Sequence, residues 1–437
     1  MSRLLVAFLM VVVVACDPAT LKHTPDAAKQ IDGAPDAVPH GVVTVTVYDT
    51  NNAGTVLVGV PVVFIEADGT VAGRPVTDST GTVTADVHPG AVITAVVSAT
   101  NAYTMMTIAD VKPGDHINLG PSKPSTNGTG TFTVSWPSNA SAASYNIVTP
   151  CGYPNAGSAT SYAVTMYDYC KSASMDLIVV ANNASGTPIG YIEKPNVAYT
   201  AGGSTFISGS YLPPGTFNAS YTNIDPGITS VSLHRVTPAN TGYSSVTNGT
   251  PANGTLNLTT LALNAQTSSI ETQVSKTNTI NVVYQNMPGN ATSLATDLGA
   301  TLLPFIGPAT LDAANKKVMV TVDTTGTTTD KPDFFFSQFQ YSRTVGTTTT
   351  TFHWYIFAPE PGDFTLPALP IEIGDVLPQG SDTAGQVFAV TLETTALTWD
   401  TVRPQAFDLL FSSGNSILGE PDTTSRIRES AYQPRGT

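Results

Sequence analysis

Short runs of alternating apolar and hydroxyl residues, separated by turn-forming residues, recur along this sequence from residue 41 onward. Residues 41–50, GVVTVTVYDT, alternate at a period of two, as expected for a β-strand with one buried face. Residues 57–69, LVGVPVVFIEADG, and residues 82–99 continue the pattern after turns built from Asn, Gly, Asp and Pro. The sequence therefore predicts an all-β fold, arranged as tandem β-sandwich domains.

Ionic side chains are scarce and mostly acidic. Charged residues make up 11% of the chain, against about 25% in an average soluble domain. The 18 Lys and Arg against 32 Asp and Glu give a formal net charge of -14, and no run of basic residues occurs. Because binding to a phosphate backbone depends on basic clusters, nucleic acid is excluded as an expected partner.

The first 15 residues have the organisation of an export signal. One positive charge at Arg3 precedes an apolar run over residues 4–14, which lies within the roughly 7 to 15 residues of a secretory apolar region. This run is shorter than the roughly 20 residues that a membrane-spanning helix requires. We therefore expect residues 1–15 to be a cleaved signal peptide.

Val13, Val14 and Ala15 stand directly before Cys16 and resemble a bacterial lipobox. The resemblance implies cleavage before Cys16 and lipidation of its thiol, which would anchor the protein in the cell envelope, at the outer membrane or cell surface. The alternative is an ordinary signal peptide in which this cysteine is incidental. Residues 16–40 are rich in Pro, Ala and Asp and lack aromatic residues, so we expect a disordered tether there.

Two further cysteines, Cys151 and Cys170, would then lie in an oxidising compartment. We predict that they form a disulfide, which would close a loop of about twenty residues and stabilise the fold by on the order of 3 kcal/mol. The alternatives are two free thiols or part of a metal site. The sequence has no CxxC motif and no histidine near either cysteine, which disfavours the metal site.

Residues 41–120 carry a second family resemblance. The segments GVPVVFIEADG, TDSTGTVTADVHPGA and ITAVV contain a Val-Pro-Val strand, an Asp-x-x-Gly turn and a Pro-Gly turn. In this order they resemble the carboxypeptidase regulatory-like and bacterial Ig-like group. The resemblance implies an accessory β-sandwich and not a peptidase, and it carries over no catalytic residue.

Residues 121–200 open with a spacer rich in Pro, Ser, Gly and Thr, which marks a boundary. The following segment, TFTVSWPSNASAASYNIV, resembles the start of a fibronectin type III-like module. In that family the Trp of the first strand packs in the core and the next strand carries a Tyr; Trp136 and Tyr145 occupy these places. The resemblance implies a second β-sandwich, in which the two cysteines fall within an insertion that the ordinary module lacks.

Residues 201–437 resemble no family that we recognise. Strand-like pieces separated by Thr, Gly, Asn and Pro turns predict one large β-sandwich region or two smaller ones. Two short segments, near residues 291–303 and 404–410, permit a helical period and are the expected helices.

The densest aromatic segment is a hairpin predicted over residues 333–357. Both faces of its second strand are apolar or aromatic, which is typical of a strand inside a two-layer core. The alternative is an exposed aromatic platform that stacks on sugar rings. Its members would be Tyr341, Trp354 and Tyr355, the candidate ligand-binding residues.

Motifs for catalysis are not found. The sequence contains neither HExxH nor GxSxG, and no two of its six histidines stand at metal-ligand spacing. Close carboxylates, such as Glu66 with Asp68 or Glu360 with Asp363, fall in turn-like contexts. We therefore expect no enzyme activity, no catalytic residue, no metal and no cofactor.

Together these features favour a non-catalytic lipoprotein of the cell envelope with a binding, adhesion or structural role. Its expected partners are the membrane, through the N-terminal lipid, and a protein or glycan ligand. The alternative is a carbohydrate-binding or carbohydrate-active protein with its site in residues 201–437. Both interpretations rest on analogy from architecture.

Overall fold

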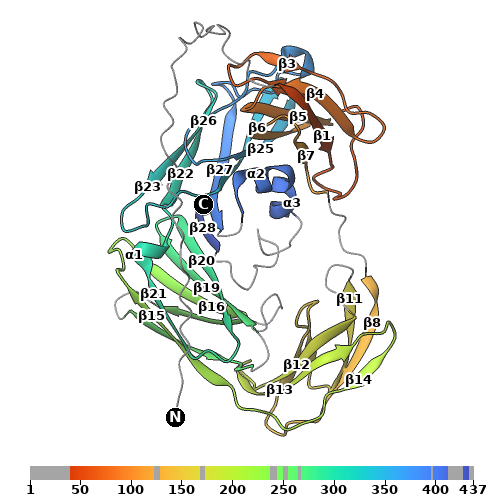
Figure 1. Ribbon diagram of the computed structural model, residues 1–437, viewed down its shortest axis with the longest axis vertical. Coiled ribbons are helices and arrows are strands. Elements are labelled where there is room, and N and C mark those ends of the chain that lie inside the picture. Colours follow the sequence, from red (N-terminus) through yellow and green to blue (C-terminus); the bar gives the residue numbers. More distant parts are fainter. Residues whose placement is uncertain are drawn as a thin grey trace, which may run out of the picture. The chain divides into compact units, whose positions relative to one another are not determined.

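The computed structural model describes residues 40–122, 128–167, 173–236, 244–249, 254–263, 267–394, 397–411 and 427–432. The expected signal peptide and the expected tether, apart from His40, lie outside these residues. The described chain is mostly β-strand and forms several sheets (Figure 1). This confirms the predicted all-β class with tandem β-sandwich domains.

A small sheet near the start of the folded chain has its strands in the order β4 (Thr82–Val87), β1 (Gly41–Val47) and β7 (His116–Leu119). Strand β1 runs antiparallel to β4 and parallel to β7. Val43, Val45 and Val47 alternate with hydroxyl residues and are fully buried. The period-two pattern therefore places one face of β1 in a core, as the sequence predicts.

A twelve-stranded sheet, here called the large sheet, combines strands from three regions of the sequence. All neighbouring pairs are antiparallel except β25 and β6, which are parallel. In spatial order the strands are β17 (Ser244–Gly249), β16 (Ser230–Val236), β19 (Thr267–Lys276), β20 (Thr279–Pro288), β28 (Ile427–Tyr432), β27 (Thr383–Thr394), β24 (Phe334–Val345), β25 (Thr348–Ala358), β6 (Ala102–Val111), β5 (Ala91–Ala99), β2 (Val62–Ile65) and β3 (Val71–Gly73).

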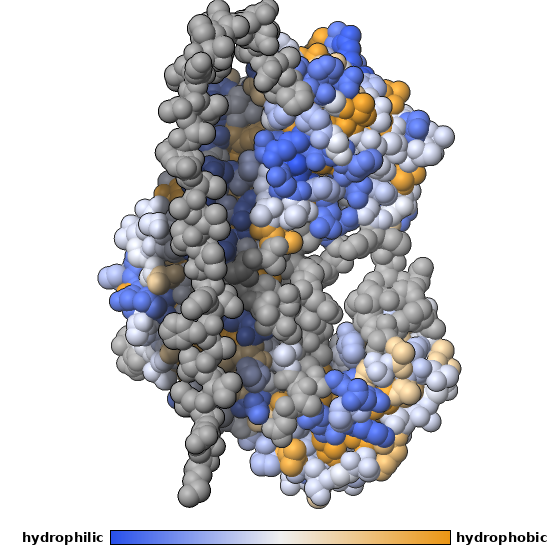
Figure 2. Space-filling view, viewed as in Figure 1, coloured by the Kyte–Doolittle hydropathy of each residue, from blue (hydrophilic) through white to orange (hydrophobic). Residues whose placement is uncertain are grey.

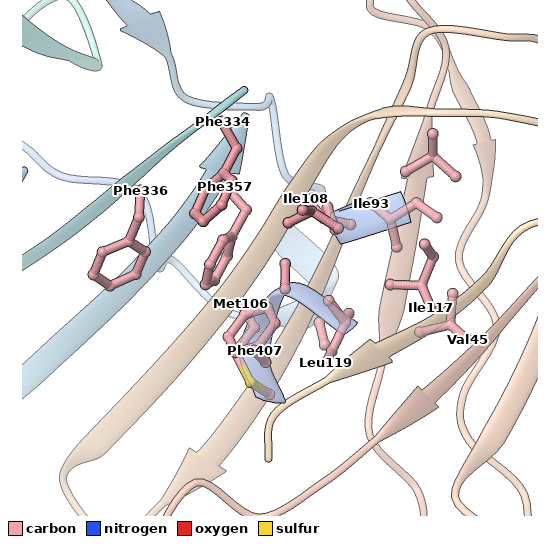
Figure 3. Close-up of a cluster of buried hydrophobic side chains, with 14 of the residues drawn as sticks. Val45, Ile93, Met106, Ile108, Ile117, Leu119, Phe334, Phe336, Phe357 and Phe407 are labelled. Atoms are coloured by element: carbon pink, nitrogen blue, oxygen red, sulfur yellow. The ribbon is translucent and has the colours of Figure 1, made fainter. Parts of the chain in front are cut away.

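One hydrophobic core contains residues from both the small sheet and the large sheet (Figure 3). Met106 of β6 belongs to the same buried cluster as Phe336 and Phe357 of the hairpin β24–β25. The ring centroid of Phe357 lies 4.9 Å from that of Phe336 and 4.5 Å from that of Phe407. The strands of residues 41–120 therefore share their core with strands from the C-terminal part of the chain.

The expected domains 41–120, 121–200 and 201–437 stay predictions as domain limits. The large sheet extends beyond the limit expected at residue 120, because β6 pairs with β25. The paired residues run from Ala102 opposite Thr351 to Ile108 opposite Phe357. An alternating pattern tells which face of a strand is buried, but it does not tell which strand lies beside it.

Two sheets formed by strands between Gly128 and Phe206 enclose a core of their own. Trp136 and Tyr145 are 2% and 3% exposed, and their rings meet edge to face with centroids 5.7 Å apart. Trp136 and Tyr145 thus pack together in a core, as the sequence predicts. One sheet has the order β10 (Asn155–Gly157), β9 (Ser144–Val148), β12 (Ser174–Asn182) and β13 (Pro188–Ala198), and the other β11 (Ser161–Tyr167), β8 (Gly128–Ser135) and β14 (Ser204–Phe206).

Two further three-stranded sheets pack on the large sheet. Phe217 of β15 shares a buried cluster with Leu233 and Ile270 of the large sheet, and Ile306 of β22 shares another with Phe335 and Trp354. The first sheet has the order β18 (Thr255–Thr260), β15 (Gly215–Thr222) and β21 (Ser293–Asp297), and the second β22 (Phe305–Asp312), β23 (Lys317–Asp323) and β26 (Phe364–Thr365).

Helices are short in the part of the chain that the structure describes. Of the helix expected near residues 291–303, only α1 is helical; most of the remainder is β21, which pairs parallel with β15. The helix expected near 404–410 is present as η3 followed by α3. None of the described helices has the length and apolar character needed to span a bilayer. The helices are α1 (Leu298–Thr301), η2 (Ile371–Ile373), α2 (Trp399–Val402), η3 (Arg403–Gln405) and α3 (Ala406–Phe411).

Removal of one ring tests whether Phe357 is buried in this core. Phe357 is fully buried, so Phe357→Ala leaves a cavity that should lower the free energy of unfolding by about 3–5 kcal/mol. Urea denaturation followed by tryptophan fluorescence measures this loss. Val345 at the hairpin tip is 73% exposed, so Val345→Ala is the matched control and should change stability by less than about 0.5 kcal/mol. Equal effects of the two variants would contradict the burial of Phe357 in the core.

Candidate functional site

The three aromatic candidates of the hairpin lie on different faces of the large sheet. Tyr341 is 1% exposed and Trp354 is fully buried, and both belong to the core beneath β22 and β23. The indole Nε1–H of Trp354 donates to the Thr107 hydroxyl at 2.8 Å. The Tyr341 ring stacks on Phe352 with centroids 4.6 Å apart, and its hydroxyl donates to the backbone oxygen of Val376.

These positions correspond to the interior-strand alternative that the sequence left open. Strand β25 is hydrogen-bonded on one side to β24 and on the other to β6, so it is a central strand. Neither Tyr341 nor Trp354 has a free ring face for a sugar. Tyr355 points to the opposite face, where it is only partly buried and packs near Phe336; burial raises the pKa of its hydroxyl. An exposed platform of all three rings is therefore not formed, because residues of β22 and β23 pack over Tyr341 and Trp354, whereas Tyr355 lies on the other face.

Two of the three cysteines, Cys16 and Cys170, lie outside the described residues. The lipidation of Cys16 and the Cys151–Cys170 disulfide therefore stay predictions. Cys151 itself lies between β9 and β10, and its backbone N–H donates to the Thr149 hydroxyl at 3.1 Å.

A polar group that the sequence did not reveal lies on the face of the large sheet that also bears the Phe336–Phe357 core. We call it the carboxylate cluster and define it as His234, Glu271, Tyr284 and Glu429. In register, His234 of β16 is opposite Glu271 of β19, which is opposite Tyr284 of β20. Glu429 of β28 is opposite Val282, two residues from Tyr284 on the same strand. Directly paired residues, and residues two apart, share one face of a sheet.

Burial and charge shift the pKa values within the carboxylate cluster. Burial, with a smaller contribution from the negative charge of Glu271, raises the pKa of Glu429 to about 7. The hydrogen bond to Glu271, whose Oε2 lies 3.4 Å from Nδ1 of His234, raises the pKa of the imidazole. Burial also raises the pKa of Tyr284. Near neutral pH the cluster therefore combines a carboxyl that is only partly ionised, Glu429, with the ion pair of Glu271 and His234. Such groups can exchange hydrogen bonds with a polar ligand.

The carboxylate cluster escapes sequence reasoning because its members come from four separate strands. Carboxylates close in sequence have local roles instead: Asp68 Oδ1 accepts from the Thr70 backbone N–H at 2.9 Å, and Glu360 pairs with Lys331 at 3.0 Å. Across the described ranges, no group of three or more His, Cys, Asp or Glu has a geometry that could hold a metal ion.

The raised pKa values predict a fold that is less stable in alkaline than in acidic solution. Protonated Glu429 contributes stability that is fully present below its ordinary pKa of 4.5 and is lost as the pH rises to about 7. The raised pKa of His234 acts in the same direction, since its contribution is lost as the pH rises through its folded-state value. Between pH 5 and pH 8, the free energy of unfolding should fall by on the order of 2 kcal/mol.

Glutamine at position 429 separates this contribution from general charge effects. Glu429→Gln should stabilise the protein at pH 8 and flatten the pH dependence, as measured by urea denaturation at both pH values. Glu360 is 62% exposed, so Glu360→Gln is the control and should leave the dependence unchanged. A wild-type stability that rises from pH 5 to pH 8 would contradict the prediction.

Comparison with known proteins gives matches only among solved structures. No protein-family model and no curated protein matches the chain. The shaft pilin SpaA of Lactobacillus rhamnosus GG is 12% identical over 40% of this chain and 100% of the pilin, with a TM-score of 0.14. The TIE protein of Bacillus anthracis is 10% identical over 59% of this chain and 50% of its own, with a TM-score of 0.16. Two B repeat units of the collagen-binding protein of Staphylococcus aureus are 11% identical over 74% and 89%, with a TM-score of 0.15. At these TM-scores the chains do not superpose, and we base no conclusion on them.

Proposed function

We propose that this chain is a non-catalytic lipoprotein of the bacterial cell envelope, anchored through Cys16, with a binding, adhesion or structural role. The lipobox-like leader and the acidic, ion-poor composition support export. The observation that supports a scaffold role is the large sheet, which joins strands from residues 62 to 432 into one continuous hydrogen-bonded array. A rigid sheet of this kind holds its connecting loops in fixed positions, as recognition by loops requires.

Buried arginines reinforce this scaffold by joining segments that are distant in sequence. Arg403, 2% exposed at its side chain, donates to both carboxylate oxygens of Asp115 at 2.8 and 3.0 Å. Arg343 donates to both oxygens of Asp382 at 2.8 Å. Two hydrogen bonds between one guanidinium and one carboxylate fix both the distance and the relative orientation of the two side chains. Such bidentate pairs therefore favour a rigid surface.

Exposed apolar side chains near one pair of loops support a binding role. Val58 and Val76 are 61% and 58% exposed, and their segments are joined by a hydrogen bond from the Gly59 N–H to the Thr77 oxygen at 2.9 Å. Figure 2 shows apolar residues on the surface among the hydrophilic ones. Exposed apolar side chains on neighbouring segments are compatible with a protein contact site there.

The lipid anchor is the part of this proposal that is simplest to test. Cys16→Ser removes the thiol that would carry the lipid, so the protein should move from the membrane fraction to the soluble fraction and lose labelling by a fatty-acid probe. Fractionation of cells that express the full chain measures this. Cys151→Ser is the control, since it removes a thiol but should leave the protein in the membrane fraction. Unchanged membrane retention of Cys16→Ser would refute the anchor.

A carbohydrate-active role is the second candidate, and the carboxylate cluster favours it. Glycoside cleavage uses one carboxyl that holds a proton and one carboxylate. Glu429, whose pKa is raised, and Glu271 lie on the same face of the large sheet with β20 between their strands, which is consistent with such a pair. If this role holds, glycan-array binding or hydrolysis by the full chain should be lost in both Glu271→Gln and Glu429→Gln. The control Glu360→Gln should keep it, and wild-type protein without retention or hydrolysis on any glycan would exclude the role.

A further inference from the structure

Strand β11 lies at the edge of the sheet that it forms with β8 and β14, and it is paired on one side only. From Ser161 opposite Ser135 to Thr165 opposite Thr131, it runs antiparallel to β8 without a bulge. In the part of the chain that the structure describes, no strand pairs with its other side. Such an edge presents a row of backbone N–H and C=O groups with which another strand can pair.

The hydrogen bonds of β8 show which residues of β11 direct their backbone groups to the free side. Thr133 of β8 donates its N–H to the oxygen of Gly203, on the side of β14. Directly opposite residues of an antiparallel pair either bond to each other or both point away. Ala163, which is opposite Thr133, therefore points away from β8. Ser161 and Thr165, two residues to either side, share this orientation because backbone direction alternates along a strand.

The side chains of these three residues leave the edge open. Ser161, Ala163 and Thr165 are exposed, and all three are small and uncharged. Native edge strands are commonly protected by lysine, proline or a bulge. Strand β13, an edge of the other sheet around this core, carries Glu193 and Lys194, and its pairing with β12 contains bulges. Residues 161–165 have none of these devices, so an added strand can approach them closely.

The charge of this sheet favours a second copy of the chain as the added partner. Strands β11, β8 and β14 read SYAVTMY, GTGTFTVS and STF, without a single Asp, Glu, Lys or Arg. The whole chain has a formal net charge of -14, so the average interaction between two copies is repulsive. At the β11 edge two copies can meet without placing like charges opposite each other, which would destabilise a strand pair.

The edge is also complementary to itself. When two β11 strands pair antiparallel about Ala163, each Ala163 lies opposite Ala163 of the other copy, and each Ser161 lies opposite Thr165. The residues whose backbone groups point outward then all fall in hydrogen-bonded pairs. A twofold pair of this kind uses the same patch on both copies and therefore closes as a dimer.

We propose that the chain dimerises by pairing β11 with β11 of a second copy, antiparallel and with Ala163 at the twofold axis. The two three-stranded sheets then join into one continuous sheet. Val164 and the partly buried Tyr162 stay on the inner face, where they pack in the core of each copy. The inference depends neither on a ligand nor on the lipid anchor, because it rests on the exposed edge.

A cysteine at the axis tests the pairing. In the proposed dimer the two Cα atoms of residue 163 are about 5.5 Å apart, a separation that a disulfide can bridge. Full chains with Ala163→Cys are expressed in cells, oxidised with copper phenanthroline and separated on a non-reducing gel. We expect a disulfide-linked band at twice the mass of the chain. The wild-type protein, which has three cysteines of its own, should not give this band.

Thr133→Cys is the matched control, because Thr133 lies directly opposite Ala163 on the next strand. In the proposed dimer the two residues at position 133 are about 15 Å apart, too far for a disulfide, so this variant should give no dimer band. A band as strong as that of Ala163→Cys would indicate contact between sheet faces and would overturn the pairing of edges. The lack of a band for Ala163→Cys would overturn it as well.

Proline and lysine at the same position provide a test without cross-linking. Because the N–H of Ala163 points outward, Ala163→Pro removes a donor of the proposed pair and leaves the bonds to β8 in place. Ala163→Lys places two like charges at the axis. In sedimentation of full chains that carry Cys16→Ser, each variant should raise the dimer Kd by about tenfold or more. A parent that stays monomeric, or a Kd that neither variant changes, would contradict the proposal.

Discussion

Backbone hydrogen bonding on both edges of β28 is the interaction on which the large sheet depends. A central strand satisfies its own N–H and C=O groups and those of two neighbours, so its loss would leave two rows of backbone groups unpaired. Here the neighbours, β20 and β27, belong to halves of the sheet that are otherwise separate in the described topology. The last described strand of the chain therefore completes the middle of a sheet whose edge strands are β17 and β3. Such pairing between distant segments makes the fold cooperative. It also means that the sheet is completed during folding only when segments that are far apart in the sequence come together.

Four arginines of this chain are buried or nearly buried and hold neighbouring segments together. Arg343, Arg403 and Arg428 each bind carboxylates. Arg235 instead lies over the Phe217 ring and donates to backbone oxygens of residues 288–291. Burial lowers the pKa of Arg235 to about 10. Burying a guanidinium is costly unless its donors are satisfied, and each of these four arginines meets that condition. In a chain with only 18 basic residues, this use of arginine favours a structural rather than a ligand-binding role for them.

The candidate site shows where sequence reasoning reaches its limit. Alternation correctly indicated that both faces of the strand around Trp354 are apolar, and it left open whether those faces are buried or exposed. The packing of β22 and β23 on this face buried Trp354 and Tyr341, and β6, from a segment about 250 residues away in sequence, supplied Thr107 as the partner of the Trp354 indole. The same kind of long-range pairing assembled Glu271 and Glu429 on one face, although neither has a neighbouring motif that indicates chemistry. No local pattern encodes a contact between strands that are distant in the chain.

The sequence by itself determined the all-β class, the strands of residues 41–99, the aromatic pair Trp136 and Tyr145 in a core, and the helix that ends in α3. It did so because alternation and turn residues act over a few positions. Only the tertiary structure decided that the N-terminal strands share a core with the C-terminal hairpin, that residues 293–297 form a strand rather than a helix, and that a C-terminal strand closes the large sheet. Those outcomes depend on which strand edges pair with each other. The pairing is stabilised by hydrogen bonds and buried apolar area between segments that are distant in sequence, and a local pattern carries no information about such segments.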